Sequence, residues 1–600
     1  MLKKDWLNPT ILLVFVILGV LITRQYGESW DELKFYKYAD SALEAYVTWP
    51  REGMIPLTGN TYDNYGPAYV MLVALGARLL NFVIPWSISD LRHLIYFITF
   101  LAGIWAFHEL AKRWLSHNAA LGATFLFMTQ PLFWGHAFIS PKDIPFLTFF
   151  LLSLFLGFRL VDSLEPVSLD SLTRHSKLTL LVLSTLWLAT VIGLFAATPL
   201  IHAWIEGLVR AAARGETNII SQIASDIHKV EPEVYIQKYF VFFLLARATF
   251  FWLSIALLTW FYQRTLPAIF RFLGSITPAA IFLGVTTCIR VLGPLAGLFV
   301  TFYALRNKGK QAILPVALYI IIAGMAMYAT WPYLWPNPIG HFIESIIVMA
   351  KYPWKGEVLF NSVMFASTDI PRSYLPILLG IQLTEPVWFL FAIGLAATII
   401  GFARKRTESR QLLLLSIVWF ILPLTIFIAS RSPLYDNFRQ IFFILPPVFM
   451  MAGVVFEKVK RTALQIALII LCLSPGIIDG LRLHPYEYIY YNRFIGGVQG
   501  AHRIFELDYW GISYREAATW LNENAPTHAN IWVEGPAHLL QLYVRPNLKI
   551  YSTYEADRAD NYDYVVATSR YNLDLTSYPD AKVIHSIERD EAVLTVIKQP

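Results

Sequence analysis

The sequence predicts a polytopic α-helical membrane protein with a small C-terminal α/β domain, and three observations support this prediction. The chain has 600 residues, of which 56% are hydrophobic and only 15% are charged, whereas an ordinary soluble protein carries about 25% charged residues. Apolar runs of about 18 to 25 residues recur along the chain, and such runs can cross a hydrocarbon core of roughly 30 Å as helices. From about Leu481 onward, the long apolar runs stop and a water-soluble pattern begins.

The first apolar run, residues 8–22, resembles a secretory signal because it follows the basic stretch MLKK. It ends in TRQYGESW, however, and this stretch contains no small-residue cleavage site. We therefore expect a retained first span with its N-terminus in the cytoplasm. Basic links between the later runs should also face the cytoplasm, at residues 112–113, 159–177, 264–271, 306–310, 404–410 and 458–461.

Placing all these links on one side fixes the rest of the topology. Residues 65–86 must then form an interfacial segment on the outer face, and residues 276–305 must cross the membrane out and back with a turn near Arg290. The count comes to about thirteen spans and leaves the C-terminus outside the cell membrane. The predicted membrane domain covers residues 1–480, and its outer loops are residues 25–90, 135–144, 331–375 and 430–440.

Residues 481–600 form the predicted C-terminal domain on the outer face. Ser513 and Glu516 have the spacing of a capping box, and they predict a helix that stops before Pro526. Short alternating or apolar stretches then predict strands at residues 530–535, 548–553, 562–569, 582–587 and 592–598. The sequence of this domain shows neither a glycine-rich phosphate loop nor a catalytic constellation, so an accessory or acceptor-handling role is its simplest interpretation.

Charge and cysteine content exclude two kinds of feature. The net charge of +6 could suggest a nucleic-acid partner, but the basic residues are spread over short links and form no single patch. No nucleic-acid partner is therefore expected. Cys288 and Cys472 both lie inside apolar runs, so no disulfide framework is expected in an outer domain.

Acidic residues concentrate in the predicted outer loops. Asp31 and Glu32 lie directly after the first span, and Asp143 lies in the loop between the third and fourth spans. Two loops that carry carboxylates therefore face the same side of the membrane.

Three short motifs in these loops resemble the GT-C superfamily of membrane glycosyltransferases. They are SWDELKFY at residues 29–36, NYGPAYVML at residues 64–72 and FISPKDIPF at residues 138–146. They are most similar to the branch that holds protein O-mannosyltransferases and lipid A aminoarabinose transferases. In layout, the resemblance covers about the first 480 residues.

The resemblance implies a polyprenyl-phosphate sugar as the donor and a lipid, glycan or protein as the acceptor, with membrane lipids around the protein. It implies an inverting transfer of a hexosyl or pentosyl group to an acceptor hydroxyl on the outer face. By similarity, Asp31 is the general base and Asp143 is the second-loop carboxylate. Asn64 and Tyr65 stand where the aminoarabinose branch has a Glu-Lys pair, so a donor contact of that lysine cannot be carried over.

The residue chemistry points the same way. Sugar transfer from a lipid phosphate needs a carboxylate to take the acceptor proton and a positive group to stabilise the departing phosphate. Asp31 can take the proton, and Glu32 and Asp143 are the other catalytic candidates. The candidate substrate-binding residues are Lys34, Asn64, Tyr65, His136, Lys142, Arg290 and Arg439. No metal or other cofactor is expected, because Lys142 already supplies a fixed cation beside Asp143, although a divalent metal is an open alternative.

Structural roles for the same residues are open alternatives. Asp31 and Glu32 could form a solvated helix start, where acidic residues suit the helix dipole, and Asp143 could cap the fourth span. Arg290 is costly in an apolar run unless it meets an anion or lines a cavity, but it could also reach the outer surface. His136 and Arg439 are more simply interpreted as structural hydrogen-bonding residues at span ends.

A transporter or lipid flippase is the competing class of protein. Such proteins usually bury ionisable residues near the bilayer midplane and often contain internal repeats. We identify neither pattern in this sequence, because its acidic residues gather in the predicted outer loops. A lipid-sugar-dependent glycosyltransferase is therefore the predicted function.

Overall fold

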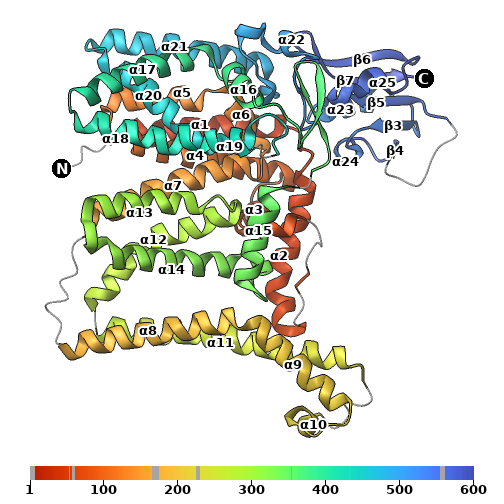
Figure 1. Cartoon of the computed structure of the whole chain (residues 1–600). Helices are drawn as coiled ribbons and strands as arrows, with labels where there is room; N and C mark the ends of the chain where they lie inside the picture. The colour runs from red at the N-terminus through yellow and green to blue at the C-terminus, as the bar shows by residue number, and fades with distance from the viewer. Residues whose placement is uncertain are drawn as a thin grey trace. The chain divides into compact units, whose positions relative to one another are not determined.

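The computed structural model describes residues 7–52, 55–56, 61–164, 174–224, 230–265, 267–352, 354–430, 433–553 and 561–600. The chain divides into two compact units (Figure 1). The first unit contains Met1–Phe35, Val73–Phe155 and Ala350–Pro600, and the second contains Tyr36–Leu72 and Leu156–Met349. The domain boundary that the sequence predicts at residue 480 stays a prediction.

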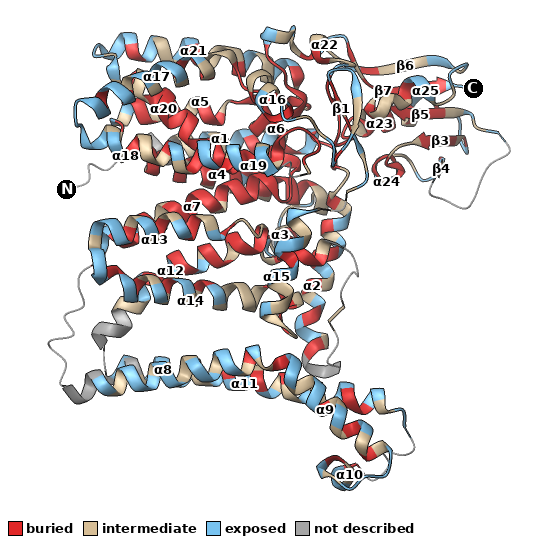
Figure 2. Ribbon diagram, viewed as in Figure 1, coloured by how far each residue is buried: buried red, intermediate tan, exposed pale blue. Residues whose placement is uncertain are grey.

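The first unit is built around a buried group of helices. The helix α20 packs against α5 and α17, and α4 packs against α5 and α6. Figure 2 shows that α5, α6 and α20 are buried over most of their length. The helices of this unit up to residue 483 are α1 (Leu7–Ile22), α4 (Ile88–Ala111), α5 (His117–Met128), α6 (Pro131–Ile139), α16 (Tyr374–Gln382), α17 (Glu385–Ala403), α18 (Thr407–Ser416), α19 (Leu422–Ser430), α20 (Pro446–Lys458) and α21 (Thr462–Leu483).

The second unit consists of helices with more exposed apolar surface. The helix α12 packs against α13 and α14, and α9 packs against α11. Its helices are α8 (Arg174–Ala196), α9 (Thr198–Ala213), α10 (Ile219–Ile223), α11 (Pro232–Thr265), α12 (Pro267–Ile289), α13 (Pro294–Lys308), α14 (Ile313–Thr330) and α15 (Pro338–Ala350). Three helices are divided between the two units: α2 (Glu32–Glu52), α3 (Ala68–Asn81) and α7 (Asp143–Ser163). The last residue of α15, Ala350, also belongs to the first unit.

The described residues contain nine helical segments that are long and apolar enough to cross a membrane. They are Ile88–Ala111, Asp143–Ser163, Leu178–Ala196, Pro232–Phe261, Phe272–Ile289, Pro294–Thr330, Glu385–Ala403, Thr407–Ser430 and Thr462–Leu483. Only 6% of an 18-residue window of Leu178–Ala196 is buried, so most of the apolar side chains of this segment are at least partly exposed. The prediction of a multi-pass helical membrane protein is confirmed, whereas the number of thirteen spans stays a prediction.

Two details of the predicted topology can be compared with the helices. The helix α12 ends at Ile289 and α13 begins at Pro294, so the predicted break near Arg290 is confirmed. The predicted interfacial segment forms α3, whose 14 residues are fewer than the roughly 20 that a span needs. The predicted loop 331–375 contains more structure than expected, namely α15 and an antiparallel hairpin of β1 (Glu357–Phe360) and β2 (Val363–Ala366).

The C-terminal segment forms a five-stranded mixed sheet with the order β4-β3-β5-β7-β6. The strands β3, β4 and β5 are parallel to one another, while β7 pairs antiparallel with both β5 and β6. All five predicted strands are confirmed, as β3 (Asn530–Glu534), β4 (Lys549–Ser552), β5 (Tyr564–Thr568), β6 (Lys582–Arg589) and β7 (Ala592–Gln599). Short helices α22 (Gly497–Ala501), α24 (Ala537–Gln541) and α25 (Leu573–Thr576) accompany the sheet.

The predicted helix of this domain is present as α23 (Tyr514–Asn524), but its capping box is wrong. The side chain of Ser513 makes no capping hydrogen bond. Its hydroxyl donates to the carboxylate of Asp508 and bonds to the hydroxyl of Thr595 at 2.7 Å. Asp508 is fully buried, and a buried carboxylate without hydrogen-bond donors is costly.

Candidate active site

The start of α2 holds two acidic residues in different environments. The carboxylate of Glu32 accepts a hydrogen bond from the backbone N–H of Ser29 at 2.6 Å and lies 3.1 Å from Nε2 of His93. Glu32 is fully buried, so its side chain fixes the start of the helix. Asp31, the residue before it, keeps 20% of its side chain exposed. A catalytic role for Glu32 stays a prediction.

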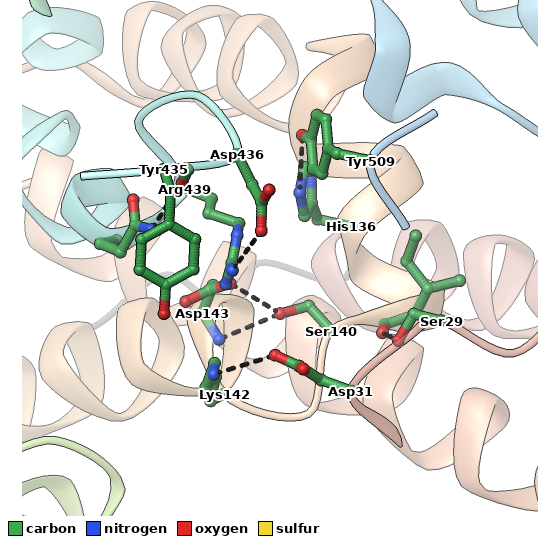
Figure 3. A network of polar contacts seen from close by, with 12 residues as sticks. Ser29, Asp31, His136, Ser140, Lys142, Asp143, Tyr435, Asp436, Arg439 and Tyr509 are labelled. Atoms are coloured by element: carbon green, nitrogen blue, oxygen red, sulfur yellow. Dashed lines mark hydrogen bonds and ion pairs between the residues drawn. The ribbon is translucent and has the colours of Figure 1, made fainter. Parts of the chain in front are cut away.

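Asp31 lies beside a lysine from the second predicted site loop. Its Oδ2 atom is 3.3 Å from Nζ of Lys142 (Figure 3), and the Lys142 side chain is only 5% exposed. The Lys142 ammonium also lies 4.8 Å from the centre of the Phe35 ring, a cation–π distance that holds the charge in place.

The surrounding charges keep Asp31 ionised. Burial by itself would raise the pKa of Asp31, but the positive charges of Lys142, Arg439 and Lys34 outweigh it and lower that pKa below its ordinary value. The Asp31 carboxylate is therefore negative at neutral pH and able to accept a proton.

Asp143 is the first residue of α7, and a buried arginine holds it. Its Oδ2 atom accepts a hydrogen bond from Nη1 of Arg439 at 2.8 Å, and Nη2 of the same guanidinium donates to Asp436 at 2.8 Å. The side chains of Asp143 and Arg439 are 0% and 1% exposed. The N–H of Asp143 donates to the hydroxyl of Ser140 at 3.0 Å, so Ser140, and not Asp143, supplies the capping side chain.

The network continues into the C-terminal segment through Asp436. The second carboxylate oxygen of Asp436 accepts a hydrogen bond from Nη2 of Arg570 at 2.6 Å, and Nη1 of Arg570 donates to the backbone carbonyl of Tyr509 at 2.6 Å. The guanidinium of Arg439 also lies 4.4 Å from the centre of the Trp510 ring. Residues of the C-terminal segment thus complete the surroundings of Arg439.

His136 lies within α6, and its contacts are those of a structural residue. Its Nδ1 atom is 2.8 Å from the backbone carbonyl of Leu132, which can only accept, so Nδ1 carries the proton. The other ring nitrogen, Nε2, accepts from the hydroxyl of Tyr509 at 3.3 Å. A substrate contact of His136 stays a prediction.

Three other predicted substrate-binding residues belong to the second unit. Asn64 is buried and accepts a hydrogen bond from the Ser345 hydroxyl at 3.2 Å. The N–H of Gly66 donates to the carbonyl of Cys288 at 2.7 Å, and an added Cβ at Gly66 would lie 2.5 Å from the Cys288 Cα. This close approach, which only glycine allows, places the loop with Asn64 and Tyr65 against the end of α12, next to Arg290.

The remaining predicted residue, Lys34, is exposed on α2, and its N–H donates to the backbone carbonyl of Asp31 at 3.1 Å.

The sequence analysis missed several residues of this network. Asp436 stands three residues before Arg439 in the predicted outer loop 430–440, and an acidic residue at that spacing was the signal that could have identified it. Tyr509 and Arg570 carry no local signal, because they reach the network only through the fold. His93, inside the candidate span α4, was also missed.

A further ionisable residue lies buried in a candidate span. Arg247 of α11 is 2% exposed, and its guanidinium donates to the Thr198 hydroxyl and to the backbone carbonyl of Trp335. It lies 4.3 Å from the centre of the Phe195 ring. Arg247 is therefore an ionisable residue buried in a candidate span, which the sequence pattern did not reveal, and protein groups accept hydrogen bonds from its guanidinium.

Within the described part of the chain, no group of three or more His, Cys, Asp or Glu residues is placed to hold a metal ion. The expectation that the protein works without a metal stays a prediction.

Comparison with known proteins gives structural neighbours only. No protein-family model matches the sequence, and no curated protein matches it. The structure of ArnT from Cupriavidus metallidurans bound to undecaprenyl phosphate is similar at 11% identity and a TM-score of 0.46, with 98% of this chain and 97% of that chain covered. The archaeal oligosaccharyltransferase AglB from Archaeoglobus fulgidus, in complex with an inhibitory peptide and a dolichol-phosphate, is similar at 14% identity and a TM-score of 0.37, with 95% and 70% covered.

These neighbours are GT-C membrane glycosyltransferases. The loop motifs of this chain resemble the same GT-C superfamily. Because the TM-scores lie below 0.5, the chemistry of this chain has to be inferred from its own residues.

Proposed function

We propose that this protein is a membrane glycosyltransferase that moves a sugar from a polyprenyl-phosphate donor to an acceptor hydroxyl on the outer face of the membrane. Asp31 is the general base in this proposal. The observation that carries it is the partly exposed Asp31 carboxylate, whose pKa is lowered and whose oxygen lies 3.3 Å from the buried ammonium of Lys142.

The proposed reaction is a single inverting displacement. The acceptor oxygen attacks the anomeric carbon of the donor sugar while its proton passes to the Asp31 carboxylate. The bond between the anomeric carbon and the phosphate oxygen breaks, and the phosphate leaves with the electron pair. A fixed positive charge near the leaving phosphate lowers the barrier, and Lys34 is the candidate for this role in the first unit. Phosphate binding by Arg290, which belongs to the second unit, stays a prediction.

Asp143 and Arg439 support the site in another way. Both hydrogen-bonding edges of the Arg439 guanidinium are engaged by Asp143 and Asp436, so its charge is already matched. Asp143 is fully buried under that guanidinium, which makes it a poor proton acceptor. We assign both residues to positioning: they fix the first turn of α7 and with it Lys142, the residue before Asp143.

The competing proposal, a transporter or lipid flippase, is less well supported by the placement of charge. Asp31 directly precedes α2, Asp143 begins α7, and Arg439 begins a short 3-10 helix. Charged residues gathered at helix starts suit chemistry at a membrane surface better than passage through the midplane. Arg247 does lie within a candidate span, but its hydrogen bonds to Thr198 and Trp335 suit a structural role.

Purified protein in liposomes tests the proposal. A radiolabelled polyprenyl-phosphate sugar and an acceptor extract from membranes are added, and both label transfer and release of polyprenyl phosphate are followed. Transfer by the wild type that Asp31→Asn abolishes would support the enzyme. Movement of the labelled lipid between leaflets without release of polyprenyl phosphate would replace it with the flippase.

A further inference from the structure

The five residues directly before Asp31 form a short loop that precedes α2, and we call residues 26–30 the base loop. The position of the Asp31 carboxylate depends on what holds this loop. Ser29 is held by the end of α6, because its hydroxyl donates a hydrogen bond to the backbone carbonyl of Ile139 at 2.9 Å. The other four residues of the base loop all contact the C-terminal segment, residues 481–600.

The first half of the base loop lies against the start of α23. The backbone carbonyl of Tyr26 accepts a hydrogen bond from Nη1 of Arg515 at 2.6 Å. At Gly27 the two backbones come so close that an added Cβ would lie 2.7 Å from the carbonyl oxygen of Ile512. Such an approach leaves no room for a side chain, so this position requires glycine.

The second half of the base loop is bound by three other residues of the C-terminal segment. The N–H of Glu28 donates to the hydroxyl of Tyr543 at 2.9 Å, and the N–H of Trp30 donates to the carbonyl of Trp510 at 3.0 Å. The guanidinium of Arg570 lies 5.1 Å from the centre of the Trp30 ring, which is a cation–π distance. The backbone donors on both sides of Ser29 are therefore satisfied by the C-terminal segment.

Two of these partners also support one another. The guanidinium of Arg515 lies 5.0 Å from the centre of the Tyr543 ring and 3.7 Å from the carboxylate of Asp90 in α4. Arg515 thus links the C-terminal segment to the base loop and to a candidate span at the same time. A purely accessory domain would need no contact with the loop that carries the base.

We propose that the C-terminal segment is a positioning element of the transfer site. Arg515 and Tyr543 hold the base loop and thereby fix the carboxylate of Asp31. This inference rests on the proposed function for the catalytic role of Asp31, whereas the attachment of the base loop can be measured without any transfer.

Hydrogen exchange measures this attachment directly. The exchange of backbone amides in peptides that cover residues 26–31 is followed by mass spectrometry on the full-length protein in detergent. Arg515→Met and Tyr543→Phe each remove a hydrogen bond to the base loop, so its amides should exchange about fivefold faster or more. Lys598→Met is the matched control, because Lys598 is buried and donates to backbone carbonyls elsewhere in the same segment. This control should leave the exchange of the base loop unchanged.

Transfer kinetics test whether the attachment acts through Asp31. Displacing a reacting group by about 1 Å can cost about a hundredfold in rate, so Arg515→Met should lower kcat by about tenfold to a hundredfold while the KM for the donor changes by less than about twofold. In an Asp31→Asn background, the same change should lower the residual rate by less than about twofold, because the base is already absent. Loss of folded protein would instead lower the rate by the same factor in both backgrounds.

The outcomes separate this inference from the proposed function. If the wild type transfers no sugar, the transferase fails, while faster exchange in the variants would still support the attachment of the base loop. If Arg515→Met fails to fold, as judged by its melting curve, Tyr543→Phe removes only a hydroxyl and takes its place in both measurements. Equal exchange in the wild type and Tyr543→Phe, or a loss of rate that is equally large in both backgrounds, would overturn the inference.

Discussion

The ammonium of Lys142 lies 3.3 Å from the carboxylate of Asp31, although 111 residues separate them in the chain. The residue that follows Lys142, Asp143, is held at 2.8 Å by the buried guanidinium of Arg439. The two loops that the sequence singled out therefore meet, and each contributes a different part: a partly exposed carboxylate from the first, and a buried, charge-matched anchor from the second.

Replacing Asp31 by Asn should abolish most of the sugar transfer. Asparagine keeps the size of the side chain but cannot take a proton, and loss of a positioned general base typically costs about 10² to 10⁴ in rate. Transfer by purified protein in liposomes measures the effect, with donor binding measured in parallel. Asp40→Asn, at an exposed position of the same helix, is the control, and a near wild-type rate for Asp31→Asn would remove Asp31 from the mechanism.

Replacing Lys142 by Met should move the acid side of the pH–rate profile upward. Lys142 is the largest of the charges that lower the pKa of Asp31, so its removal raises that pKa. The carboxylate then takes up a proton at a higher pH, and activity falls earlier on acidification. The measurement is kcat/KM against pH for wild type and variant. Lys34→Met should shift the profile less, and a Lys142→Met profile that stays in place would argue against Asp31 as the titrating base.

Replacing Arg439 by Met should destabilise the protein strongly. The change leaves the carboxylate of Asp143 buried without its guanidinium, and breaking a buried ion pair from one side costs about 3–5 kcal/mol. The apparent melting temperature in detergent should fall clearly. Arg493→Met provides the contrast, because Arg493 pairs with Asp479 at 3.4 Å while 60% exposed, and such surface pairs contribute about 0–1 kcal/mol. Similar melting temperatures for the two variants would contradict the anchoring role.

Sugar transfer should continue after removal of divalent cations. Lys142 already places a fixed positive charge beside Asp31, where a metal ion would otherwise be useful. Activity is measured in excess chelator and again after magnesium or manganese is added back. Loss of transfer in chelator that either metal restores would show that a metal takes part.

Cysteine labelling should show the C-terminal sheet outside and the link between α17 and α18 in the cytoplasm, because the basic link 404–410 is expected inside. Asp580→Cys and Thr407→Cys are exposed reporter positions, and the native Cys288 and Cys472 are buried. A membrane-impermeant maleimide added to intact cells should label position 580 and spare position 407. The reverse pattern would invert the topology.

Local sequence patterns determined much of the fold. The apolar runs predicted the spanning helices, because crossing a membrane demands length and hydrophobicity that are written into consecutive residues. The five strands at 530–599 and the helix break near Arg290 were predicted for the same reason: periodicity, glycine and proline act within a few residues. Asp31, Lys142 and Asp143 were identified because they follow apolar runs.

The tertiary structure alone decided which side chains became partners. Asp143 meets Arg439 across 296 residues, Asp436 meets Arg570 across 134, and His136 meets Tyr509 across 373. The capping box at Ser513 failed for the same reason, because the fold buried Asp508 next to a hydroxyl that the local pattern had assigned to the helix. Burial makes an unmatched charge or polar atom costly. Because burial is a property of the packed chain, consecutive residues were enough to predict the apolar helices and the strands, whereas the charge partners of the site depend on the fold.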